Sequence, residues 1–455
     1  MAPPRARSQP KSPIGRIFAN TVWLLGGKGF GALCGIAYLA ILTHSLGLKG
    51  FGHFSLIFGM AQALIAVAGF QTWRVVVRYG SEHVHAEQWD RFGRLGLLCG
   101  VFDAIGAVCG CILAGVIIYG FGPMLDLNPA YVDTAFWFNC AMVWSLVSAP
   151  TGIVRALHRF DLAVYVEAVV PLGRLIAAIV IWYTGPSVER FLFAWAAIDL
   201  FEAACYWAMA RWLCPQAISR RNFARAREAL AENDGVARFF WITYASATLQ
   251  AVTRYGPLFA VGGLVGTRSA GLFRLASQLT QAMSKLSTLL TRAVYAEVAL
   301  TKVASSAAEF RKLAVQTSLG AAVAGALVVL VAMLGGRQLF SLFGGTEFER
   351  GAVILVPLAI AGSFELASVA FEPVLHSSGR ARQALFGRVL AVLALLVAVP
   401  FLYEHGAVGI AWAVAISGAV AYLAQGIAAF RTLSAPHGPI RDAPAEMDEL
   451  PASRF

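Results

Sequence analysis

Charge is the scarcest property of this chain. Only 13% of its 455 residues are charged, whereas 58% are hydrophobic, and a soluble domain has about a quarter of its residues charged. The mean hydropathy of +0.68 is correspondingly high. Apolar runs of 20 or more residues recur along the whole chain, and a helix of that length crosses a hydrocarbon core of about 30 Å. The composition therefore excludes a soluble domain and predicts an all-α integral membrane protein.

Twelve such apolar runs are predicted to be transmembrane helices. Short alternating strands of the kind found in membrane barrels do not occur between them. The runs cover residues 17–43, 52–73, 95–119, 132–154, 162–184, 190–213, 239–265, 269–291, 313–335, 351–375, 384–402 and 407–430.

The residues that usually mark a catalytic or metal site are also few. Seven cysteines, an odd number, show no metal-site spacing, so we read them as free thiols. His83 and His85 are two residues apart and would point to different faces of a helix, so a polar connection is favoured over a metal site. The segment "LLGGKGFG" (24–31) is not a nucleotide loop, because Val22 stands where that loop needs glycine. We expect no metal, cofactor or enzymatic activity.

Lysine and arginine are distributed unevenly between alternate loops. With the N-terminus placed in the cytoplasm, 26 of the 36 basic residues fall in predicted inside segments, five in outside loops and five within helices. Cytoplasmic loops of membrane proteins carry such an excess. The net charge of +11 is therefore read as topology information, and both termini are predicted to be cytoplasmic.

The predicted helices divide into two sets of six. A cytoplasmic tail (1–16) precedes a first lobe (17–213), and a linker (214–238) leads to a second lobe (239–430) and a cytoplasmic tail (431–455) of disordered composition. The linker is basic. Either a helix lying on the membrane surface or a solvated linker fits its sequence.

An internal repeat supports this division. A shift of 219 residues places "LGLKGFGHFS" (46–55) on "VGTRSAGLFR" (265–274), at the outer turn between the first two helices of each half. Transporters are often built from such repeats, and equal orientation of the halves makes this one parallel. The matching pairs are Gly47 with Gly266, Lys49 with Arg268, Gly52 with Gly271, Phe54 with Phe273 and Gln62 with Gln281.

The sequence around the first of these turns resembles a known family. "HSLGLKGFGHFSLIFGMAQALIAVAGF" (44–70) is similar to the opening of bacterial lipid-linked oligosaccharide flippases, the O-antigen and exopolysaccharide translocases of the multidrug/oligosaccharidyl-lipid/polysaccharide exporter superfamily. The resemblance implies two six-helix lobes around a central cavity that opens alternately to each side. It also implies a cargo of oligosaccharide on polyprenyl diphosphate. The matching residues are Leu46, Gly47, Phe51, Gly52 and Phe54.

Ionisable residues within predicted helices are the candidate functional residues, because they are costly in a bilayer. Arg174 and the acids Asp199 and Glu202 lie near the middles of consecutive antiparallel helices. They are predicted to form a neutralised structural pair, and a site for a coupling ion or proton is the alternative. Glu365, near the middle of the tenth helix, is a further candidate for either role.

Three other cations are predicted to bind the diphosphate: Lys28, Arg254 and Lys285. They lie on the first, seventh and eighth helices, which line the cleft between lobes in the resembling family. Fixed positive charge interacts strongly with phosphate in a medium of low dielectric. Alternatively, each cation pairs with a glutamate such as Glu365. The stripe Gly27, Gly31 and Gly35 beside Lys28 would let another helix or the cargo approach closely.

Several further residues carry weaker expectations. Gly256 and Pro257 follow Arg254 directly and are a possible hinge, although proline is also ordinary in membrane helices. Arg274, one turn from the outer end of its helix, is expected to extend to the membrane surface. Asp103, toward the inner end of its helix, is likewise expected to extend to water at the membrane surface.

Function follows from the resemblance and the intramembrane cations together. We expect a flippase of the bacterial inner membrane that moves polyprenyl-diphosphate-linked glycan to the outer leaflet for surface polysaccharide synthesis. Membrane lipids, and polymerase and glycosyltransferases of the same route, are its expected partners; nucleic acid is not. A cation-coupled multidrug antiporter is the alternative, against which three deep cations argue. A polymerase or glycosyltransferase is less favoured, because the outside loops are short and no inside loop contains Asp-x-Asp.

Overall fold

A computed structural model describes residues 13–299, 307–368, 371, 375 and 381–434. The described part of the chain contains helices and turns but no strand, which confirms the prediction of an all-α protein. The first half consists of α1 (Pro13–Ala68), α2 (Thr72–His85), α3 (Trp89–Phe121), η1 (Gly122–Leu125), η2 (Pro129–Tyr131), α4 (Val132–Trp144), α5 (Ser148–Ala156), α6 (Phe160–Glu167), α7 (Val169–Thr184) and α8 (Val188–Leu213).

Short helices connect the two halves. They are η3 (Pro215–Ile218), α9 (Arg220–Ala224), η4 (Ala226–Glu228) and α10 (Ala229–Glu232). The second half then consists of α11 (Val236–Val265), α12 (Thr267–Ala299), α13 (Ala307–Gly344), η5 (Thr346–Gly351), α14 (Ala352–Ala367), α16 (Ala381–Leu402), η6 (Tyr403–His405) and α17 (Gly406–Ser434).

Eight segments of the described residues are long and apolar enough to cross a membrane. Two of them contain more than one predicted run: Gly29–Ala68 is interrupted at Gly47, and Arg382–Arg431 is interrupted by η6. Two predicted runs, 239–265 and 269–291, are the helices α11 and α12, which are not among the eight. The chain is thus a multi-pass helical protein, and the count of twelve crossings stays a prediction.

Two glycines break the chain at the turns that the repeat relates. Gly47 interrupts α1 at φ 62° and ψ 179°, and Gly266 separates α11 from α12 at φ 103° and ψ 166°. A positive φ combined with a ψ near 180° is a backbone conformation that essentially only glycine adopts. The two turns therefore share an unusual backbone conformation, which agrees with the proposed repeat at these positions. We call this end of the helices the Gly47 end.

Close packing joins the two halves near these turns. A Cβ atom on Gly52 would overlap the carbonyl oxygen of Thr267, and one on Gly271 would lie 3.2 Å from the Cα of Gly52. The missing side chains thus let α1 and α12 meet backbone to backbone. Asp126, in the loop after η1, adds a polar link, because its Oδ2 accepts hydrogen bonds from the backbone N of Thr267 at 3.1 Å and from its Oγ1 at 2.8 Å.

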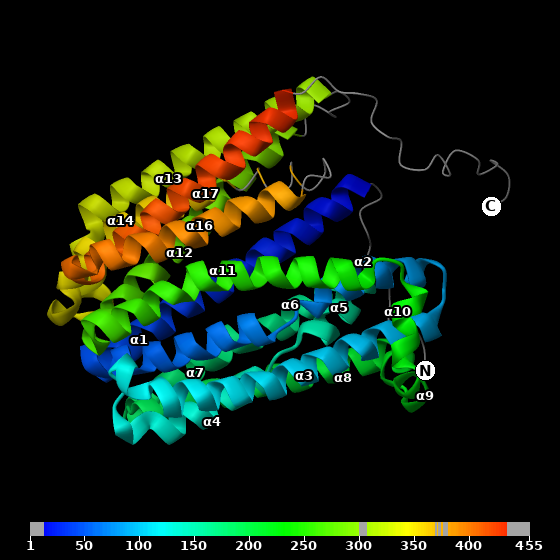
Figure 1. Ribbon diagram of the computed structural model, residues 1–455, viewed down its shortest axis with the longest axis horizontal. Helices are drawn as coiled ribbons and strands as arrows, with labels where there is room; N and C mark the ends of the chain where they lie inside the picture. The colour runs from blue at the N-terminus through cyan, green and yellow to red at the C-terminus, as the bar shows by residue number, and fades with distance from the viewer. Residues whose placement is uncertain (1–12, 300–306, 369–370, 372–374, 376–380, 435–455) are drawn as a thin grey trace.

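The helices of the two halves form separate groups in space (Figure 1). α13, α14, α16 and α17 pack mainly on one another, whereas α3, α4, α7 and α8 form a second group. α1 contacts both groups, and α12 packs on α1 as well as on α13 and α14. The groups lie together at the Gly47 end and diverge toward the opposite end, where α9 and α10 lie; we call this the linker end. A central cavity stays a prediction.

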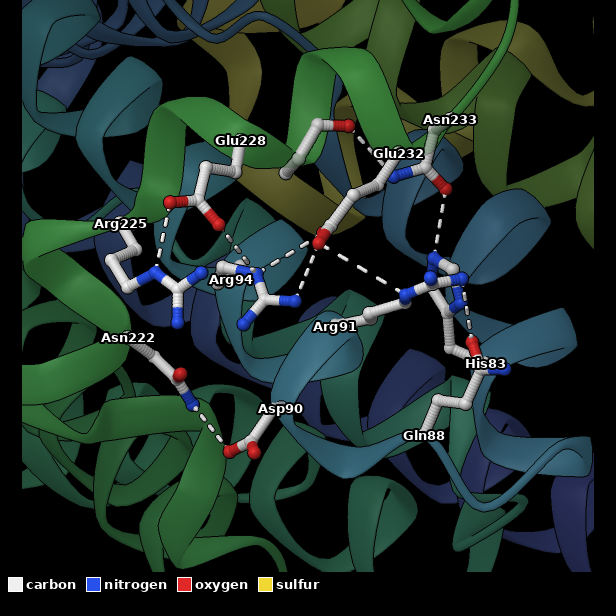
Figure 2. Close-up of polar contacts among 11 residues, drawn as sticks. His83, Gln88, Asp90, Arg91, Arg94, Asn222, Arg225, Glu228, Glu232 and Asn233 are labelled. Atoms are coloured by element: carbon white, nitrogen blue, oxygen red, sulfur yellow. Dashed lines mark hydrogen bonds and ion pairs between the residues drawn. The ribbon is translucent and has the colours of Figure 1, made fainter.

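The linker packs tightly on the first half (Figure 2). Arg94 of α3 is buried and donates from Nε to Glu232 Oε2 at 3.1 Å. His83 Nε2 lies 2.9 Å from Asn233 Oδ1, and both residues are buried. The segment folds into several short helices, and contacts with α2 and α3 bury part of it; whether these helices lie on the membrane surface stays a prediction. His85, Glu87 and Asp90 are exposed, as a solvated polar connection predicts, whereas the packing of the linker buries His83.

Candidate functional site

The helices α7 and α8 bring Arg174 and Asp199 together. Arg174 Nη2 lies 2.8 Å from both carboxylate oxygens of Asp199, and each residue is only 8% exposed. The guanidinium also lies over two aromatic rings, 5.2 Å from the centroid of Phe58 and 5.6 Å from that of Trp195. Such a pair compensates the cost of burying each charge alone. Whether it serves structure or coupling stays a prediction.

Arg274 of α12 faces the same aromatic ring from the second half. Its guanidinium lies 5.7 Å from the Phe58 centroid, at a distance typical of a cation–π contact. Its Nε is buried without a hydrogen-bond partner among the described residues. The expectation that Arg274 extends to the membrane surface was wrong. The side chain turns inward because α1 places Phe58 within its reach.

A polar stripe continues from Arg274 along α12. Gln281 and Lys285 follow it by seven and eleven residues, spacings that keep all three on one helix face. Lys285 is exposed and lies about 16 Å further along the axis. Arg254 of α11 is also exposed and donates from Nη2 to Gln281 Oε1 at 3.3 Å.

These cations differ from Arg174 in lacking an acid. Within the described part of the chain, no ion pair joins Arg254, Arg274 or Lys285 to a carboxylate. Arg254 and Arg274 are close enough to influence each other electrostatically. We call Arg254, Arg274 and Lys285 the cation set. Unpaired arginine and lysine can bind a phosphate by charge-assisted hydrogen bonds.

The remaining predicted site residues lie apart from this set or are only partly described. Lys28 falls in α1, but its side chain is outside the described part of the structure. Glu202 lies one turn from Asp199 on α8 and is half-buried. Glu365 is exposed on α14, which packs on α12, α13 and α17, and makes no ion pair among the described residues. α11 continues as a helix through Gly256 and Pro257.

The glycine stripe beside Lys28 allows close helix packing at one position. A Cβ on Gly31 would lie 3.4 Å from Pro171 of α7. This contact lies within the first half. Gly31 therefore serves contact between α1 and α7, whereas a contact with cargo stays a prediction.

Asp103 is buried instead of extending toward water. Its Oδ1 accepts a hydrogen bond from Thr72 Oγ1 and its Oδ2 accepts one from the backbone N of Ala149, both at 2.7 Å. Thr72 begins α2, and Ala149 lies in the first turn of α5. The carboxylate therefore joins the starts of two helices, where free N–H groups attract negative charge. The expectation of a water-exposed Asp103 was wrong because these helix starts enclose it.

Sequence reasoning could have found Arg274, because its spacing from Gln281 and Lys285 is visible in the chain. What it could not supply is the position of Phe58, 216 residues earlier. The structure shows no group of three or more His, Cys, Asp or Glu side chains placed to hold a metal within its described residues.

Comparison with known sequences now places the chain. The family of polysaccharide biosynthesis proteins matches residues 17–295, which is more than half of the chain. This protein belongs to that family. An Escherichia coli (strain K12) relative, "Inner membrane protein YghQ", is 27% identical over 342 residues, which cover 73% of this chain and 93% of the relative.

Solved structures show the same fold at low sequence identity. A multidrug resistance MATE family transporter of the MOP superfamily, in an inward-facing conformation, aligns with a TM-score of 0.68 and 17% identity. The alignment covers 89% of the present protein and 95% of the transporter. "Lipid II flippase MurJ, inward closed conformation" aligns with a TM-score of 0.65 and 10% identity over 90% and 89% of the two chains. An outward-facing MATE family transporter aligns with a TM-score of 0.56 and 16% identity, over 90% of the present protein and 93% of the transporter. The fold is thus that of MOP-superfamily transporters.

Proposed function

We propose that this protein is a flippase that moves polyprenyl-diphosphate-linked oligosaccharide from the cytoplasmic to the outer leaflet of the bacterial inner membrane. The observation that carries the proposal is the cation set, whose three members have no carboxylate partner within the described residues. A lipid diphosphate supplies the negative charge that such a set lacks. Lys28 is proposed as a further member.

Alternating access is the proposed mechanism. The two helix groups meet at the Gly47 end and diverge at the linker end. If the groups separated at the Gly47 end and came together at the linker end, the diphosphate would move past the cation set. Each cation would bind phosphate oxygens by hydrogen bonds strengthened by low dielectric. Gly256 and Pro257 would let α11 bend during the exchange, since proline leaves one helix carbonyl unpaired.

The family and the two kinds of neighbour support this proposal. The chain belongs to the polysaccharide biosynthesis proteins, and a lipid II flippase shares its fold. We propose a multi-pass inner-membrane location, because a relative is named an inner membrane protein. The excess of basic residues in the predicted inside loops supports placing both termini in the cytoplasm. Polymerase and glycosyltransferases of the same route are the proposed partners.

Deletion of the gene tests the function directly. We expect lipid-linked oligosaccharide to accumulate in the inner leaflet while surface polysaccharide is lost, because synthesis continues and translocation stops. Complementation with the triple variant Arg254→Gln, Arg274→Gln and Lys285→Gln should not restore export at equal protein level. Arg268→Gln is the matched control, since Arg268 is exposed in the first turn of the same helix. Absence of any accumulated lipid-linked glycan would refute the flippase proposal.

A cation-coupled multidrug antiporter is the second candidate. The MATE transporters of the same fold favour it. The pairing of Asp199 with Arg174 weighs against it, because this carboxylate is already neutralised in the first half. Drug susceptibility of the deletion strain separates the two proposals: an antiporter predicts increased sensitivity with normal surface polysaccharide.

A further inference from the structure

An apolar groove runs along the outer surface of the first half, away from the cation set. Its volume is about 570 Å³. The wall on α3 is a single helix face at spacings of three and four residues, from Leu97 to Cys109, which are about 18 Å apart along the axis. The other walls are Trp207 of α8 and Phe223 of α9.

Small residues create this groove. Gly100 and Ala104 lie on the α3 wall, and a Cβ on Gly100 would lie 3.1 Å from the ring of Trp207. No side chain of its lining is charged, and its only polar side-chain groups are the thiol of Cys109 and the indole N–H of Trp207. Both helices belong to candidate membrane spans. A hydrocarbon chain is the ligand that such a surface fits within a bilayer.

Positive charge lies at the linker end of the groove. Arg211 follows Trp207 by four residues on α8, so it lies on the same face one turn nearer the linker end, and it is exposed. η4, which follows the helix that contributes Phe223, carries the exposed Arg227, whereas Arg221, two residues before Phe223 on α9, lies on a different face of that helix.

The acids of the linker, Glu228, Glu232 and Asp234, form no ion pair with these three arginines within the described residues. Glu232 is bound by Arg94, and Glu228 by Arg225 at 2.8 Å (Figure 2). Asp90 faces the side-chain amide of Asn222 at 3.4 Å. Among the described residues, no ion pair or side-chain hydrogen bond is formed by Arg211, Arg221 or Arg227. An apolar groove that ends in unpaired arginine matches a lipid with an anionic headgroup.

We propose that this groove binds an anionic phospholipid of the surrounding membrane, with one acyl chain between α3 and α8 and the phosphate at Arg211 and Arg227. The bound lipid would hold α9 and the linker against the bilayer surface. This proposal stands apart from the transported cargo, because the groove lies on the outer surface of one half.

Quenching of Trp207 by brominated lipid tests the proposal at the site itself. The full chain is placed in phosphatidylcholine vesicles containing a minor fraction of brominated phosphatidylglycerol or of brominated phosphatidylcholine. Eleven tryptophans contribute fluorescence, so the signal of Trp207 is the difference between the protein and its Trp207→Phe variant. We expect quenching of this signal at several-fold lower content of the anionic lipid, about fivefold for each arginine in contact.

Two sets of variants separate headgroup from chain binding. Arg211→Ala with Arg227→Ala should remove the preference for phosphatidylglycerol, whereas Arg431→Ala, an exposed arginine in the last turn of α17, should preserve it. Ala104→Phe should fill the groove and reduce quenching by both lipids. Val116→Phe, on an exposed face of the same helix outside the groove, is its control.

Three results would overturn the proposal. Equal quenching by both brominated lipids would show that no anionic headgroup is selected. An unchanged preference in the double arginine variant would place the headgroup elsewhere. Relief of quenching by added polyprenyl phosphate but not by added unbrominated phosphatidylglycerol would show that the groove binds the lipid carrier of the cargo instead.

Discussion

Arg174 and Arg274 lie over the same phenyl ring, yet their electrostatic surroundings are opposite. Arg174 in the first half has Asp199 at 2.8 Å. Arg274 in the second half has no carboxylate partner within the described residues, and its charged neighbours are Arg174 and Arg254. The two guanidinium groups lie 5.2 Å and 5.7 Å from the centroid of Phe58.

The difference teaches that burial alone does not assign a role to a membrane arginine. A buried charge needs compensation. Arg174 obtains it within its own half, from a helix that is adjacent in sequence. Arg274 obtains it only in part, from the face of Phe58, and a bound anion would complete it. A paired charge is therefore expected to matter first for stability, and an unpaired one first for transport.

Removal of Asp199 should have the largest effect. Asp199→Asn leaves Arg174 buried without a counter-charge, so we expect the free energy of unfolding to fall by about 3 to 5 kcal/mol. Unfolding by increasing dodecyl sulfate in mixed micelles measures this loss. The double variant Arg174→Gln with Asp199→Asn should recover most of it, because both charges are then gone. Normal stability combined with lost transport in Asp199→Asn would instead favour a coupling role.

Removal of Arg274 should act on transport and leave stability nearly unchanged. We expect Arg274→Ala to lower the rate of glycan export by about 10- to 100-fold, the loss expected for one charge-assisted contact. Arg274→Lys keeps the charge and should retain intermediate activity. Export is measured as surface polysaccharide per unit of protein in the membrane. A large loss of stability in Arg274→Ala with unaltered export would show that Arg274 serves the fold and not transport.

An acid placed beside the cation set should make it resemble the pair in the first half. Gln281→Glu puts a carboxylate where the Arg254 guanidinium now donates at 3.3 Å. We expect export to fall by about tenfold, because the new ion pair competes with the diphosphate. Gln281→Met removes the amide without adding charge and should cost less. If both variants export equally, charge at this position does not govern transport.

Loss of the contact between Asp126 and Thr267 should have the smallest effect on stability, because the Asp126 carboxylate is exposed. Hydrogen bonds from the backbone and side chain of Thr267 lower the pKa of Asp126 below its ordinary value. Its contribution to stability is thus present above the pKa of the unfolded chain and is lost as pH falls through the lower folded pKa. We expect Asp126→Asn to change the free energy of unfolding by less than about 1 kcal/mol and to reduce its acid dependence. If the stability of Asp126→Asn fell with decreasing pH as steeply as that of the unaltered protein, the pH dependence would come from another group.

Much of the fold could be predicted because its signal is local. Apolar runs in the sequence became α3, α8 and α13, since length and hydropathy suffice to predict a spanning helix. The depth argument also placed Arg174 beside Asp199, because consecutive antiparallel helices bring equal depths together. The surroundings of Arg274 and Asp103 were predicted wrongly, because they depend on contacts that are not local. Their positions along one helix say nothing about Phe58 or the start of α5, which come from distant segments.

The sequence by itself determined that the chain is a helical membrane protein, where its intramembrane charges fall, and which glycines break it at Gly47 and Gly266. These properties depend on transfer to a bilayer and on the conformational freedom of single residues. Only the tertiary structure decided that Arg254, Arg274 and Lys285 have no carboxylate partner within the described residues, because contacts between helices far apart in the sequence depend on packing alone. The same packing bound the linker to α3 and left Arg211 and Arg227 without an ion pair among the described residues near the end of the apolar groove.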